Sequence, residues 1–203
     1  MSDKPSPHLA HLLLFVLCLS GCSDAPERVH PLSIDANAAG LAAIEQYDAD
    51  GDGMIGADEL KDAPSLHSAM ANLDTDRDGA LSAEEVAARI RNWQEAKVGL
   101  ITGVSCQVTY KGRPLAGATV IFEPEEFLGD SVRACTGTTS KRGRTGLRIP
   151  DAPHKIPGAS PGFYRIKITS PHVEIPAKYN TQTKLGREIA ENGTGEVVLN
   201  LGK

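Results

Sequence analysis

The sequence predicts a multidomain chain with a small all-α part followed by an all-β sandwich. A twelve-residue acidic pattern occurs twice, at 48–59 and at 74–85, with apolar residues at helical spacing on its flanks. From Val104 onward, apolar residues instead alternate with period two, in seven short runs separated by turn residues. The first pattern indicates helices around two loops, and the second is typical of a β-sandwich.

Both acidic repeats follow the pattern D-x-D-x-D-G-x5-E, which suits calcium because this hard cation takes six to eight oxygen ligands. Positions 1, 3, 5 and 12 supply carboxylates, position 6 is a glycine that tolerates a positive φ, and position 7 supplies a backbone carbonyl. The expected ligands are Asp48, Asp50, Asp52, Met54 and Glu59 in the first loop, and Asp74, Asp76, Asp78, Ala80 and Glu85 in the second.

Apolar residues at matching offsets flank both loops. Ile44 and Tyr47 precede the first loop as Met70 and Leu73 precede the second, which puts each pair on one face of an incoming helix. Val86, Ile90 and Trp93 continue at helical spacing after the second loop, where Ser82 and Glu85 form a capping box.

Over roughly residues 36–95 these features resemble the EF-hand family. The resemblance implies two bound calcium ions and a short β-bridge between Ile55 and Leu81. The loops start only 26 residues apart, at Asp48 and Asp74. Pro64 explains this spacing, because it limits the helix after the first loop to about 57–63 and a new helix begins near Ser65. We therefore expect a compact pair, spanning 37–95, that does not open like a calcium sensor.

Charge divides the chain unequally. Residues 1–99 carry 7 Lys and Arg against 17 Asp and Glu, a formal charge of −10, whereas residues 100–203 carry 14 against 9, a charge of +5. The acidic half is the half that contains the calcium loops. Basic residues of the second half are scattered, so we expect no nucleic-acid partner.

The N-terminus predicts export and lipidation. An apolar run at 12–19 is too short to span a membrane and is typical of a signal peptide, here 1–21. It ends in Leu19-Ser20-Gly21-Cys22, which resembles a bacterial lipobox and implies a lipid on Cys22. The alternative is an ordinary secretory signal. Residues 22–36 would form a tether to a cell-envelope membrane, and Ser23 favours the outer membrane, facing the periplasm or the cell surface.

The β part is expected to span 102–203. Its opening, Val104-x-Cys106-x-Val108-Thr109-x-x-Gly112-x-Pro114-Leu115-x-Gly117-Ala118-x-Val120-x-Phe122, resembles carboxypeptidase-regulatory-like (transthyretin-like) domains, which have a transthyretin/Ig-like sandwich fold. These are turn and core residues, so the resemblance implies a fold and no chemistry. The runs 183–189 and 195–201 are expected to form a last hairpin around Asn192-Gly193.

Two cysteines remain after Cys18 leaves with the signal peptide and Cys22 is lipidated. Cys106 and Cys135 lie on strands expected to be neighbours, where an oxidising compartment favours a disulfide. The alternative is two buried thiols that act as small apolar residues. The sequence is compatible with both a disulfide and two free thiols.

Catalytic patterns are missing from the sequence: no H-x-H or H-E-x-x-H occurs, and Ser and Asp occupy turns. We therefore expect a non-enzymatic protein with a structural or binding sandwich that melts the same with or without calcium. Two alternatives are a dockerin-like module that docks on another envelope protein in a calcium-dependent way, and an accessory protein that binds polysaccharide.

The lipobox gives a direct prediction. Replacing the residue that would carry the lipid, in Cys22→Ala, should leave the precursor uncleaved by the lipoprotein peptidase and abolish its labelling with an acyl-chain probe. Retained acyl label on the Cys22→Ala chain would show that the lipobox interpretation is wrong.

Overall fold

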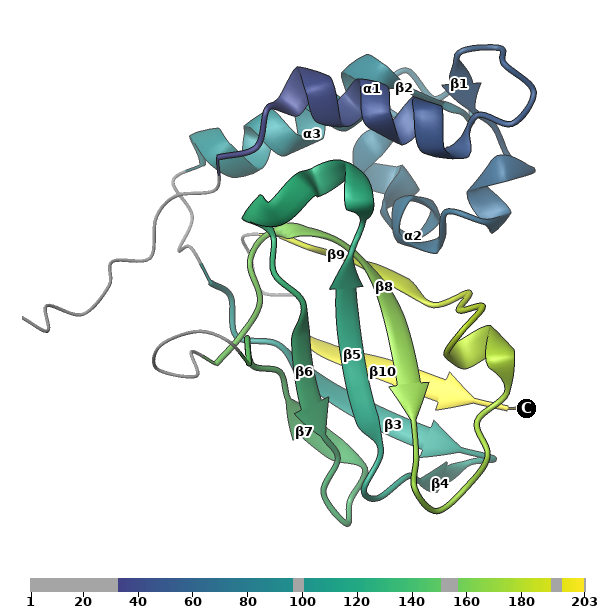
Figure 1. The fold of residues 1–203 in the computed structure, drawn as a ribbon, viewed down its shortest axis with the longest axis vertical. Coiled ribbons are helices and arrows are strands. Elements are labelled where there is room, and N and C mark those ends of the chain that lie inside the picture. The colour runs from purple at the N-terminus through teal and green to yellow at the C-terminus, as the bar shows by residue number, and fades with distance from the viewer. Residues whose placement is uncertain (1–32, 97–100, 151–156, 191–194, 203) are drawn as a thin grey trace, which may run out of the picture.

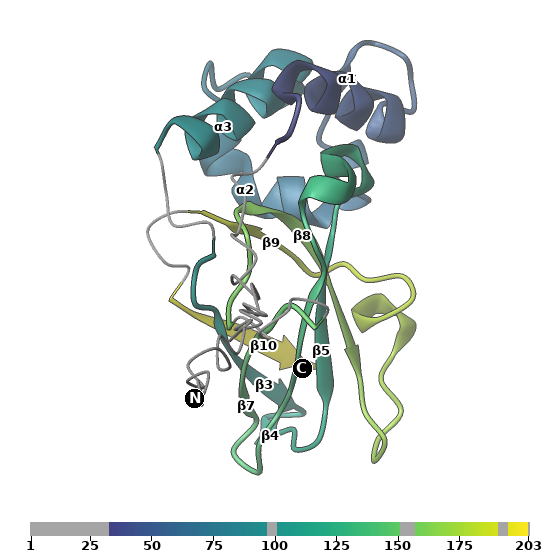
Figure 2. The ribbon, with the colours of Figure 1, turned by 60° about the vertical axis from the view of Figure 1, so that its left-hand side comes forward.

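The computed structural model describes residues 33–96, 101–150, 157–190 and 195–202. Its helices form a layer at one end of a β-sandwich (Figure 1, Figure 2). The predicted signal peptide, Cys22 and most of the predicted tether lie outside the described residues. Within the described ranges, no helix has the length and apolar character needed to cross a bilayer.

The helical part follows the predicted order. Its elements are α1 (Ala36–Tyr47), η1 (Glu59–Lys61), α2 (Pro64–Leu73) and α3 (Ala83–Glu95). Asp35 starts α1 by accepting a hydrogen bond from the Ala38 N–H at 3.0 Å, as N-cap carboxylates do. Pro64 starts α2 at a position where its missing N–H costs no helical hydrogen bond. The predicted capping box of Ser82 and Glu85 starts α3.

The helix predicted over 57–63 is too long. The structure has only the three-residue 3-10 turn η1 in that stretch, with Leu60 as its one buried residue. Proline disfavours the α conformation in the residue before it, and Ala63 indeed has φ −111° and ψ 64°. Pro64 therefore shortens the helix further than expected, and the chain enters α2 directly afterwards.

Eight strands of the described β part form two four-stranded sheets. Their bounds are β3 (Ser105–Tyr110), β4 (Arg113–Pro114), β5 (Thr119–Pro124), β6 (Cys135–Thr138), β7 (Arg144–Gly146), β8 (Gly162–Thr169), β9 (Gly186–Ile189) and β10 (Glu196–Leu201). One sheet has the order β6-β5-β8-β9, and in the other β3 pairs with β10, β4 and β7. The short 3-10 segments η2 (Glu126–Ser131) and η3 (Ala177–Tyr179) lie in the connections. The two-residue strand β4 pairs antiparallel with the end of β3.

The predicted last hairpin is wrong. β9 pairs antiparallel with β8, whereas β10 belongs to the other sheet and pairs parallel with β3. The parallel register sets Val197 beside Cys106 and Leu199 beside Val108, so that all four side chains are buried in the sandwich. Burial of that apolar face outweighs the local turn signal of Asn192-Gly193, and those two residues lie outside the described ranges.

Both cysteines of the sandwich are free and fully buried. Cys106 lies on β3 and Cys135 on β6, which belong to different sheets. The expectation of neighbouring strands is therefore wrong, and buried free thiols are the alternative that the structure shows. Burial raises the pKa of each thiol to about 12, so both are neutral at physiological pH and act as small core residues.

The helical layer and the sheets share one continuous hydrophobic core. Consecutive residues of β8 point to opposite sides of the sheet: Tyr164 packs against Phe122 inside the sandwich, with ring centroids 6.0 Å apart. Phe163 instead packs against Trp93 of α3 at 4.7 Å. Because Phe163 and Trp93 are both buried, α3 covers the outer face of this sheet at the start of β8.

Strand β9 approaches α2 so closely that only glycine fits between them. A Cβ added to Gly186 would lie 2.1 Å from the carbonyl carbon of Pro64 and 2.2 Å from the backbone nitrogen of Ser65. Backbone atoms cannot move aside as the end of a flexible side chain can. The first turn of α2 and the start of β9 are therefore in direct backbone contact.

This contact predicts the cost of a single methyl group. Gly186→Ala should lower the free energy of unfolding by about 1–3 kcal/mol, the usual cost of overpacking, as measured by urea denaturation. Gly103→Ala is the matched control, since its added Cβ would meet nothing within 4 Å. Equal stability of the two variants would show that the helical layer does not pack on β9 as described.

Candidate metal centres

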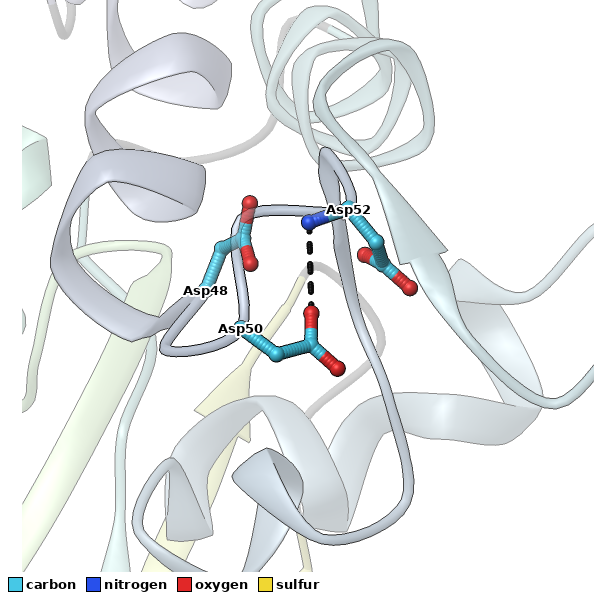
Figure 3. A group of neighbouring side chains, drawn as sticks. All are labelled: Asp48, Asp50 and Asp52. Carbon is cyan, nitrogen blue, oxygen red and sulfur yellow. Dashed lines mark hydrogen bonds between the residues drawn. The ribbon is translucent and has the colours of Figure 1, made fainter.

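The first acidic loop brings its three aspartates close together. Carboxylate oxygens of Asp48, Asp50 and Asp52 lie within 4.8 Å of one another (Figure 3). Asp48 accepts hydrogen bonds from the N–H groups of Gly51 at 2.6 Å and Gly53 at 2.8 Å. The Asp52 N–H donates to Asp50 at 3.2 Å. These bonds fold the loop around its own carboxylates.

The second loop repeats this geometry. Carboxylate oxygens of Asp74, Asp76 and Asp78 also lie within 4.8 Å of one another. Asp74 accepts from Arg77 at 2.6 Å and Gly79 at 3.1 Å. The Asp78 N–H donates to Asp76 at 3.1 Å. Two loops with different sequences between their aspartates thus adopt the same hydrogen-bonded arrangement.

Two positions of each loop have left-handed backbone conformations. Position 6 was expected to, and Gly53 and Gly79 have φ 87° and 88°. Position 4 was missed: there Gly51 has φ 77°, but Arg77 has φ 65°. A non-glycine residue in this conformation costs about 1 kcal/mol or more. The sequence gives no signal for the strain at Arg77, because its side chain suits an exposed turn.

The two loops are joined as the resemblance implied. Strands β1 (Met54–Ile55) and β2 (Leu81–Ser82) pair antiparallel, with Ile55 opposite Leu81. Both side chains are fully buried. Of the position-7 residues, Met54 begins β1 and Ala80 directly precedes β2. The Met54 N–H donates to Asp52 at 2.8 Å and the Ala80 N–H to Asp78 at 2.9 Å.

The position-12 glutamates accept hydrogen bonds from the backbone of their own loops. Glu59 accepts from the N–H groups of Ala49 at 2.6 Å and Gly56 at 2.7 Å. Glu85 makes the same two contacts in its loop, from Thr75 and Ser82, both at 2.9 Å. Each glutamate therefore ties position 2 to position 9 and closes its loop.

These hydrogen bonds also favour the ionised form of the two glutamates. The N–H groups of Gly56 and Ala49 hold the pKa of Glu59 below its usual value. Partial burial acts to raise the pKa of Glu85, but the hydrogen bonds from Ser82 and Thr75 outweigh it and lower the pKa. Each loop thus presents carboxylate oxygens at positions 1, 3, 5 and 12, a donor set that fits a hard divalent cation.

Comparison with known protein families agrees with this geometry. A family model described as EF hand matches residues 41–62 and 66–88. Residues 36–95 are an EF-hand region. The two matches and the two aspartate clusters are consistent with two calcium ions, one in each loop. Searches of the curated proteins and of the solved structures found no match to this chain.

Two further glutamates contact the EF-hand region from the β part, and sequence reasoning missed both. Glu125 precedes η2 and is 1% exposed, and Glu188 lies on β9 and is 7% exposed. A glutamate on a strand ordinarily faces solvent, so its burial could not be foreseen before the helices were placed. Burial also raises the pKa of Tyr47, the residue before Asp48, and the adjacent Glu125 raises it further.

Proposed function

We propose that the chain is a calcium-binding, lipid-anchored protein of the bacterial cell envelope whose β-sandwich has a structural or binding role and no catalytic one. Calcium binding is supported by the two loops, which match in their carboxylate clusters, their hydrogen bonds and their residues with left-handed backbone conformation. The lipid anchor rests on the lipobox at Leu19-Ser20-Gly21-Cys22.

A structural role for calcium fits the chemistry of the loops. Calcium outside the cytoplasm is abundant, and extracellular modules need dissociation constants of only about 10⁻⁴–10⁻³ M. Bound calcium would neutralise the crowded carboxylates of each loop. An ion that binds only the folded chain stabilises it by about 2.7 kcal/mol at one hundred times its dissociation constant.

The two rival functions gain no support from the described residues. A dockerin-like module needs a free apolar helical surface. The faces of α2 and α3 that carry Leu66 and Trp93 are buried in the shared core, and Leu41 of α1 is the one large hydrophobic residue exposed on the described helices. Polysaccharide binding favours exposed aromatic rings. In the described β part Phe122, Phe127, Phe163 and Tyr164 are buried, and Tyr110 and Tyr179 are partly buried. A role in which the EF-hand region stabilises the sandwich therefore agrees best with the packing.

The proposal predicts two calcium ions per chain in a calorimetric titration of the purified protein. Glu59→Gln and Glu85→Gln should each weaken one site by tenfold or more, since position 12 supplies both oxygens of one carboxylate and glutamine supplies one. Glu84→Gln is the matched control, because this exposed neighbour of Glu85 pairs with Arg91 and should leave both affinities unchanged. A double variant of Glu59 and Glu85 that binds two ions like the parent would contradict the proposal.

A further inference from the structure

Glu188 of β9 joins the two helices that flank the second calcium loop. One oxygen of its carboxylate accepts hydrogen bonds from Arg89 Nε at 2.6 Å and from Trp93 Nε1 at 2.9 Å. The other oxygen accepts from Asn72 Nδ2 at 3.0 Å. Asn72 lies on α2, two residues before Asp74, whereas Arg89 and Trp93 lie on α3, which leaves the loop. One carboxylate from the sheet thus holds the entering helix to the leaving helix.

Glu125 has the same relation to the first loop. Its Oε2 accepts from the hydroxyl of Tyr47 at 2.6 Å, and its Oε1 accepts from the hydroxyl of Ser65 at 2.5 Å. Tyr47 ends α1 and directly precedes Asp48, while Ser65 lies in the first turn of α2, beyond the loop and η1. Arg165 of β8 balances the buried charge, with its Nε 3.4 Å from Glu125.

The geometry points to Glu125 and Glu188 as positioning residues for the calcium loops, so that the β-sandwich sets the calcium affinity of the EF-hand region. This inference rests on the proposed calcium binding. In the second loop, Asp74 follows α2 directly and Glu85 lies in the first turn of α3. Any change in the angle between α2 and α3 therefore moves the first ligand of the loop relative to the last.

Burial makes the contacts of Glu125 and Glu188 with the helices rigid. Glu125 and Glu188 are almost wholly inaccessible to water, so an opening movement of the helices would leave a buried carboxylate without its donors, which is strongly unfavourable. Partners that orient metal-binding groups from outside the ligand set commonly change metal affinity by about 10- to 100-fold. By linkage, calcium in the loops would in turn favour the docked helical layer.

Other contacts between the two parts do not have this arrangement. Lys184, before β9, contacts the carbonyl of Lys61 at 3.0 Å and pairs with Asp62, and both of these lie in one segment. The Trp93–Phe163 contact likewise involves α3 alone. Only the two glutamates, among the ion pairs and hydrogen bonds found between the described parts, link the helices on both sides of a loop.

The test measures calcium binding by one loop at a time and then replaces Glu125 or Glu188. In a Glu59→Gln background, where only the second loop keeps its full ligand set, adding Glu188→Gln should weaken calcium binding about tenfold, whereas adding Glu125→Gln should change it less than twofold. In a Glu85→Gln background the order should reverse. Calcium affinity is measured by calorimetric titration of the full-length chain, with far-UV circular dichroism to establish that each variant is folded.

Glu196→Gln is the control for loss of one glutamate charge, because Glu196 pairs with Arg144 at 3.2 Å on the more exposed surface of the other sheet and should leave both affinities unchanged. Asn72→Ala serves if Glu188→Gln does not fold, since it removes only the link between α2 and Glu188. It should weaken the second loop alone. The inference would be overturned if Glu125→Gln or Glu188→Gln weakened calcium binding equally in both loops. It would also be overturned if neither variant changed the calcium affinities. A parent chain that binds no calcium would instead overturn the proposed function.

Discussion

The burial of two carboxylates between the helical layer and the sheet is the constraint on which the arrangement of the molecule depends. Glu125 and Glu188 belong to the β part, yet all of their side-chain hydrogen-bond donors identified in the structure belong to the EF-hand region. A buried carboxylate that loses its donors is costly, by several kcal/mol. The helical layer and the sandwich therefore stay together in one relative position, although each has the composition of a separate domain.

Apolar packing adds to this constraint. Trp93 and Phe163 are in ring contact, and the buried residues of both parts form one cluster. The backbone of Gly186 meets that of Pro64 with no room for a side chain. The EF-hand region thus buries the apolar faces of α2 and α3 in a core that it shares with the sandwich.

Electrostatics explains why calcium matters to such an arrangement. Residues 1–99 carry a formal charge of −10, and eight of their carboxylates occupy the expected ligand positions of the two loops. Without a cation the three aspartates of each cluster repel one another, which disfavours the compact loop. With calcium the same groups become ligands, and the binding free energy stabilises the folded loops. The helices next to these loops, which Glu125 and Glu188 contact, are stabilised with them.

Short-range patterns were enough to predict the loops and the order of the helices, though not the length of the one over 57–63, because the residues concerned are close in sequence. The D-x-D-x-D-G spacing, the capping box of Ser82 and the proline at Pro64 all act within a few residues. The pairing of β10 with β3 and the burial of Glu188 could not be predicted in this way, since both depend on segments about 90 to 115 residues apart. One signal was present in retrospect: Phe163 and Tyr164 are consecutive aromatic residues, and a strand with apolar residues on both faces is covered on both faces.

Differential scanning calorimetry of the full-length protein, with calcium and with a chelator, tests the central claim that the two parts form one calcium-coupled unit. The account predicts a single cooperative transition that includes the sandwich. This replaces the expectation from the sequence of a sandwich that melts the same with or without calcium, because the two parts share one core. The midpoint of this transition should rise by about 5–10 °C for each saturated site, from about 2.7 kcal/mol per site in a chain of this size. Two transitions, of which the one from the β part keeps its midpoint when calcium is removed, would contradict the account.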